Sequence, residues 1–139
     1  MDTRLETPVF VMRMAIGLMA SLAGLDKFFN ILADWSSYVS PAVVPFLPFS
    51  PETLMSIVGL VELAVGVGVL TAWPVIAAYA ASGWLLLVAV NLVIGGQLDI
   101  AVRDVVLSIA AFTLARLVQL RQESAVAHRP ITVSVSGPA

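Results

Sequence analysis

The sequence contains no cysteine and a single histidine, His128, close to the C-terminus. Without cysteine the chain can form no disulfide, thiolate metal site or iron–sulfur cluster, and thiol catalysis is excluded. A histidine so near the chain end is badly placed to hold a haem or a metal inside a helical bundle. We therefore expect no metal site and no covalently bound cofactor. Any redox chemistry must belong to a bound diffusible molecule or to a partner protein.

Charged residues are also scarce. They make up 12% of the 139 residues, whereas about 25% is usual in soluble domains. The net charge of −2 offers no basic surface for nucleic acid. In contrast, 60% of the residues are hydrophobic and the mean hydropathy is +1.00. This composition excludes a disordered chain and an ordinary cytosolic enzyme, and it predicts a protein that resides in the lipid bilayer.

Four apolar stretches are long enough to cross a bilayer, which requires about 20 residues per helix. They cover approximately residues 9–29, 52–70, 74–94 and 100–120. We expect an all-α bundle of four transmembrane helices in residues 1–123, followed by a polar tail in residues 124–139. Apolar and polar residues alternate at 131–136, which is the pattern of a short strand that could pair with a partner.

Local signals indicate where these helices begin and end. Pro8 stands at a natural helix start. Ser50 has the character of an N-cap, followed by Pro51 as the first helical residue. Gly95-Gly96 is expected to stop the third helix. Arg13 interrupts the first apolar stretch, and acidic residues precede it. Both features are atypical of a signal peptide, so we expect the first helix to be retained.

Positive charges near helix ends predict the orientation in the membrane. The loop of residues 30–51 and the turn between the second and third stretches contain no lysine or arginine. Five of the six arginines instead lie toward the two chain ends: Arg4, Arg13, Arg116, Arg121 and Arg129. We therefore expect both termini in the cytoplasm of a bacterium, with the protein in its inner membrane and the 30–51 loop facing outward. Aromatic and proline residues in that loop favour either a segment lying on the membrane interface or a passive cap over the bundle.

Each apolar stretch has one face of small or polar residues, and Glu62 lies on such a face in mid-span. A charge at that depth costs about 2.5–3.5 kcal/mol. Arg13 is the expected partner of Glu62, because the two residues lie about 6 Å and about 12 Å deep from the same side and their long side chains can close that gap. The pair is either a structural ion pair that fixes the helix register or an anchor for a ligand head group, with Glu62 as a protonatable carboxylate.

A second polar group gathers in depth at the outer end of the bundle: Asp26, Lys27, Asn91, Gln97, Asp99, Arg103 and Asp104. Their opposite signs predict mutual pairing, and they can snorkel to water. Asp104 lies on the small-residue face of its helix, so we expect its side chain to point inward. Trp84 lies in mid-membrane, where it either packs in the core or offers its ring to a ligand.

Four motifs combine these positions: Arg13-x3-Gly17, Gly24-Leu25-Asp26-Lys27-Phe28-Phe29, Val58-Gly59-Leu60-Val61-Glu62-x3-Gly66 and Asp99-Ile100-Ala101-Val102-Arg103-Asp104. Together they resemble the DoxX/DoxD family of small four-helix integral membrane proteins. The resemblance covers roughly residues 9–120. Arg13, Glu62 and Asp104 would match polar positions of the family.

That family is similar to the membrane subunit of thiosulfate:quinone oxidoreductase. The resemblance therefore implies an oxidoreductase subunit with a pocket for a quinone or another small ligand between its helices. Glu62 and Asp104 would act as catalytic proton donors or acceptors. The residues that bind the ligand would be Arg13, Lys27, Trp84 and Asn91. The other hypothesis is a structural or accessory subunit of a larger membrane complex, with no chemistry of its own. Both hypotheses predict other membrane protein subunits as partners.

Overall fold

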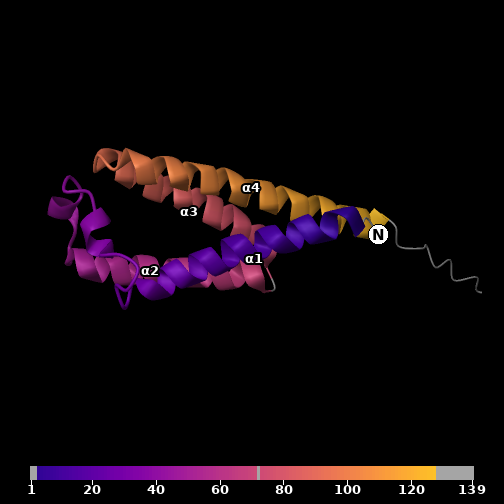
Figure 1. Ribbon diagram of the computed structural model, residues 1–139, viewed down its shortest axis with the longest axis horizontal. Coiled ribbons are helices and arrows are strands. Elements are labelled where there is room, and N and C mark those ends of the chain that lie inside the picture. The colour runs from indigo at the N-terminus through magenta and orange to yellow at the C-terminus, as the bar shows by residue number, and fades with distance from the viewer. Residues whose placement is uncertain (1–2, 72, 128–139) are drawn as a thin grey trace, which may run out of the picture.

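The computed structural model in Figure 1 describes residues 3–71 and 73–127. These residues form four α-helices: α1 (Thr3–Asp26), α2 (Pro51–Leu70), α3 (Pro74–Ile94) and α4 (Leu98–Ala127). Two short 3-10 helices, η1 (Trp35–Tyr38) and η2 (Val44–Phe46), lie in the connection between α1 and α2. No strand occurs in this part of the chain, so the all-helical prediction is confirmed for it. The strand pattern at 131–136 lies outside the described residues.

The helix ends follow from local chemistry. The Ser50 side chain accepts a hydrogen bond from the backbone N–H of Thr53 at 3.3 Å, and Pro51 is the first residue of α2. This satisfies one of the backbone donors that a helix start leaves unpaired. α3 ends before Gly95, and Gly96 has a φ of +79°, a conformation that glycine adopts without strain.

Two helices differ in length from the expected spans. α1 begins at Thr3, so Pro8 lies inside the helix instead of starting it, and α1 already ends at Asp26. The proline ring removes one helical hydrogen bond near the helix end, where the loss is small. α4 runs from Leu98 to Ala127 and therefore includes the first four residues of the segment expected as a polar tail.

The four helices pack as two antiparallel pairs, α1 with α2 and α3 with α4. The pairs contact each other mainly through α2 with α3 and α1 with α4. Figure 1 shows them close together near the start of α1 and diverging toward the connection between α1 and α2. We call the first of these the terminal end and the second the loop end.

Glycines bring the backbones of α1 and α2 into close contact. A Cβ atom built on Gly59 would lie 2.6 Å from the carbonyl oxygen of Gly24, and one built on Gly24 would lie 2.6 Å from that of Gly59. Gly66 meets Ser21 and Gly17 in the same way, one turn or two further along. Small residues of this kind allow close helix packing in membranes, where the hydrophobic effect does not drive helices together.

The main apolar core and the buried charged residues lie toward opposite ends of the bundle. The apolar core lies toward the terminal end and consists of Val9, Ile16, Val69, Ala77, Ala78, Ala81, Ala111, Leu114, Ala115 and Val118. The buried charged residues lie toward the loop end, with Asp26 and Lys27 at the end of α1 and Asp104 in the second turn of α4. The loop end is therefore the part of the fold where polar chemistry is possible.

Three segments of the described helices are long and apolar enough to cross a membrane: Leu5–Asp26, Pro51–Leu70 and Pro74–Ile94. They support a multi-pass membrane protein, and their many exposed apolar side chains fit a lipid environment. α4 does not belong to this set. Asp99, Arg103 and Asp104 lie in its first two turns, and Arg116 and Arg121 lie in its second half.

Candidate functional site

The centre of the loop end is an ion pair between Lys27, which directly follows α1, and Glu62 on α2. The Lys27 Nζ lies 2.6 Å from the Glu62 Oε2, and the two side chains are 5% and 15% exposed. The close approach of Gly24 and Gly59 permits this contact, because the Lys27 Cβ would lie 2.9 Å from a Cβ at position 59. An amine and a carboxylate so far removed from water are stable as ions only when they are paired.

The expected pairing of Glu62 with Arg13 is wrong. The Arg13 guanidinium donates instead to the carbonyl oxygens of Val69, Leu70 and Thr71, at 3.0, 3.0 and 3.1 Å. Gly17 on α1 contacts Leu70, the last residue of the antiparallel α2. Arg13 lies one turn before Gly17, so its side chain is located beyond the last turn of α2. The final carbonyls of a helix lack intrahelical partners and carry partial negative charge, so they attract a guanidinium.

A tryptophan of the connecting loop completes the surroundings of Lys27. Its Nζ lies 3.7 Å from the centre of the Trp35 ring, a cation–π contact. Trp35 in turn donates its indole N–H to the Asp26 Oδ2 at 2.7 Å. Asp26 also accepts the backbone N–H groups of Ile31 and Leu32, both at 3.0 Å. Sequence reasoning missed these contacts. An acidic residue at a helix end followed by an aromatic loop residue is too common a pattern to predict them.

Asp104 lies inside the bundle, as its place on the small-residue face of α4 predicts. Its side chain is 6% exposed and accepts from Arg103 at 3.1 Å, whereas the Arg103 side chain is 61% exposed. The positive charge of Lys27 also acts on the Asp104 carboxylate. Charges of alternating sign from α1, α2 and α4 therefore gather at the loop end, and we call Lys27, Glu62, Arg103 and Asp104 the charge cluster.

Both polar side-chain atoms of Asn91 form hydrogen bonds with the connection between α1 and α2. Its Nδ2 donates to the Tyr38 carbonyl oxygen at 2.9 Å, and its Oδ1 accepts from the Ser40 backbone N–H at 3.2 Å. Gln97 adds a donor to the Ser37 carbonyl oxygen at 3.3 Å. These contacts favour the interpretation of η1 and its neighbours as a cap, and they give Asn91 a structural role.

Trp84 differs from the other predicted ligand-binding residues, because its indole N–H is buried without a hydrogen-bond partner among the described residues. Ser21 Oγ and Gln97 Oε1 share this state. Trp84 lies ten residues before the end of α3 and Glu62 eleven residues after the start of α2. Both positions are about 15–17 Å from the loop-side helix ends, so the two side chains lie at similar depth.

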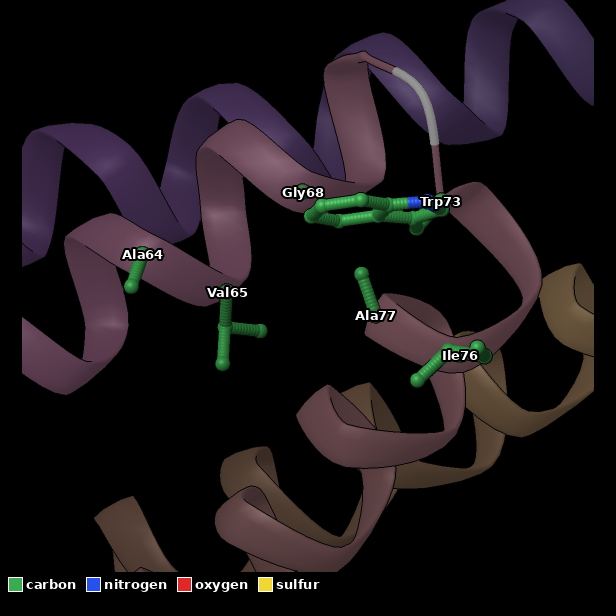
Figure 2. A pocket seen from close by; sticks show the side chains of 6 residues that line it. All are labelled: Ala64, Val65, Gly68, Trp73, Ile76 and Ala77. Atoms are coloured by element: carbon green, nitrogen blue, oxygen red, sulfur yellow. The ribbon is translucent and has the colours of Figure 1, made fainter.

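Two pockets flank α2. An apolar pocket of about 310 Å³ lies toward the terminal end, between α2 and the start of α3 (Figure 2), and is lined by Ala64, Val65, Gly68, Trp73, Ile76 and Ala77. A polar pocket of about 210 Å³ lies at the loop end and is lined by Lys27, Phe28, Asn30, Ser36, Glu52, Met55 and Ser56. Of the predicted site residues, Lys27 alone lines one of these two pockets. The described residues contain no group of three or more potential metal ligands.

Comparison with family models, with curated proteins and with solved structures finds no match for this chain. Its function is therefore inferred from its own side chains and their contacts.

Proposed function

We propose that this chain is a DoxX-like integral membrane subunit of a quinone-linked oxidoreductase and that it binds a quinone, or a small ligand with a similar carbonyl group, between its helices. In this proposal α4 crosses the membrane as well, both termini face the cytoplasm, and the membrane is the inner membrane of a bacterium. Glu62 and Asp104 exchange protons with the ligand.

The observation that carries the proposal is the buried indole N–H of Trp84, which has no acceptor among the described residues. A buried donor left without a partner costs about 1–3 kcal/mol. A ligand carbonyl would remove this cost, and a quinone ring presents such a carbonyl on an apolar frame. Glu62 lies at the same depth on α2. It offers a carboxylate for the proton that a quinone gains or loses as it changes its redox state.

The contacts narrow the set of residues that can bind a ligand. The polar side-chain atoms of Arg13 form hydrogen bonds with helix carbonyls, and those of Asn91 form hydrogen bonds with the loop backbone. Lys27 is held by Glu62 and Trp35. In the proposal Trp84 therefore donates the hydrogen bond to the ligand, Glu62 and Asp104 exchange protons with it, and Lys27 orients the Glu62 carboxylate.

Quinone that co-purifies with the full chain in mild detergent tests the proposal. We expect quinone per chain to fall by about tenfold in Trp84→Phe, which keeps an aromatic side chain and removes a donor worth about 1–3 kcal/mol. The matched control is Trp73→Phe, because Trp73 is 71% exposed and its N–H can be removed without loss. Absence of quinone from the wild-type chain, or equal quinone in both variants, would contradict quinone binding.

The accessory-subunit hypothesis is favoured by a different observation. The charge cluster satisfies its own members, and Asn91 and Gln97 donate to backbone carbonyls of the loop. Buried charges of this kind can fix helix register without chemistry. A larger complex that purifies with this chain, contains no quinone at it and is unaffected by Trp84→Phe would support that hypothesis instead.

A further inference from the structure

The polar pocket at the loop end shares Lys27 with the buried ion pair. Asn30, Ser36, Glu52 and Ser56 provide polar walls, and Lys27 belongs to the same lining. Lys27 is itself buried, and its Nζ is 2.6 Å from Glu62. Lys27 therefore links the lining of this pocket to the Glu62 carboxylate.

The opposite direction from Glu62 is apolar. α1 and α2 are in close contact there, where Gly17 meets Leu70 and Gly66 meets Ser21. The Ser21 hydroxyl has no hydrogen-bond partner among the described residues, so no hydrogen-bonded chain continues through it. Beyond it lies the apolar core of the terminal end. The pocket on that side of α2 has no charged residue in its lining.

We propose that the polar pocket is the aqueous route to Glu62, so that Glu62 exchanges protons with the loop face of the membrane domain and not with the terminal face. The proposal rests on the proposed function for the use of that proton. The step is an acid–base equilibrium: the Glu62 carboxylic acid gives its proton to a water molecule that reaches it through the pocket and becomes a carboxylate paired with the Lys27 ammonium, and hydronium returns the proton by the same route. Lys27 is a positioning residue in this step.

Charged groups on several elements lie on the loop side of Glu62. Lys27, directly after α1, pairs with it; Arg103 and Asp104 lie in the first two turns of α4, Glu52 lies at the start of α2, and Asp34 lies in the connecting loop. α3 carries no Asp, Glu, Lys or Arg, and its titratable Tyr79 bonds Gln119 on α4. The groups that can relay or modulate the proton therefore lie on the loop side of Glu62.

The absence of cysteine makes a direct test possible, because a single introduced thiol is the only one in the chain. The full chain with Glu62→Cys is reconstituted in vesicles and treated from outside with a charged, membrane-impermeant thiol reagent, which reacts with the thiolate. Two exposed marker positions identify the faces: Ala42→Cys in the loop and Glu123→Cys near the end of α4.

We expect the thiol at position 62 to react from the same face of the membrane domain as the Ala42→Cys marker, and therefore in the same fraction of the vesicles. Filling the pocket with Ser56→Trp should slow this labelling by about an order of magnitude, equivalent to about 1.4 kcal/mol of added barrier. Ala64→Trp, on the exposed apolar side of α2, is the matched control and should leave the rate unchanged.

Four results would each overturn the route. They are labelling of position 62 from the same face as Glu123→Cys, labelling from both faces, no labelling while both markers react, and an unchanged labelling rate in Ser56→Trp. If Glu62→Cys does not fold, Ser56→Cys takes its place. Failure of the Ser56→Cys thiol to react from the loop face would also overturn the route. The reaction requires no quinone, so its failure is distinguishable from a failure of quinone binding.

Discussion

Replacement of Lys27 by methionine removes one partner of the buried ion pair and leaves the Glu62 carboxylate without its cation. The Lys27 and Glu62 side chains are 5% and 15% exposed, so water compensates little of the loss. Breaking such a pair costs about 3–5 kcal/mol, and loss of the cation–π contact with Trp35 adds about 0.5–2 kcal/mol. We expect the free energy of unfolding to fall by about 3 kcal/mol or more in Lys27→Met, measured by reversible denaturation in detergent.

A double-mutant cycle separates the pair from the packing of each side chain. Glu62→Met alone should also be strongly destabilising, whereas Lys27→Met with Glu62→Met should recover most of the loss, because no buried charge then remains unpaired. Arg121→Met is the control. Its pair with Glu6 spans 3.6 Å between side chains that are 45% and 38% exposed, and it should cost less than about 1 kcal/mol. Additive effects of the two methionines, or a cost below about 1 kcal/mol for Lys27→Met, would refute the buried pair.

Three further perturbations test the packing around the site. Gly59→Ala should destabilise the chain by about 1–3 kcal/mol, because the new methyl would lie 2.6 Å from a backbone oxygen, whereas Gly83→Ala meets no atom within 4 Å and should be neutral or stabilising in the same unfolding assay. Arg13→Met leaves three carbonyls at the end of α2 without their donor, and we expect a loss of about 2–3 kcal/mol; equal stability would contradict this capping role. Asn91→Leu releases the loop backbone, so limited proteolysis within residues 30–50 should become faster, while an unchanged cleavage rate would show that the loop is held elsewhere.

Much of the helical architecture could be predicted because its causes are local. An apolar run between a proline and a glycine pair predicts α3 at Pro74–Ile94, and a serine before a proline predicts the start of α2. α1 was harder, because its start depends on whether residues before Pro8 continue the helix, and a proline near a helix start permits either outcome. Whether α4 crosses the membrane stays a prediction, since its charged first turns set it apart from the three candidate spans.

The candidate site could be predicted in part. Helical periodicity placed Asp104 on an inward face, and mid-span position singled out Glu62 and Trp84. The partner of Glu62 could not be found in this way. Depth along two antiparallel helices depends on how far one projects beyond the other, and the expected spans set the wrong offset between α1 and α2. The contacts between Gly24 and Gly59 determine the true register, and they bring Lys27 to Glu62 instead of Arg13.

Hydropathy, charge distribution and helix-end residues are sufficient to identify an apolar helical protein and its most costly buried charges. Each of these features acts within a few positions along the chain. The identity of each charge's partner, the apolar core at one end and the polar pocket at the other arise from contacts between helices far apart in the sequence. Those contacts depend on register and rotation, which small residues at the interface set through close backbone packing. The side of the bundle from which water can reach Glu62 is a consequence of that packing.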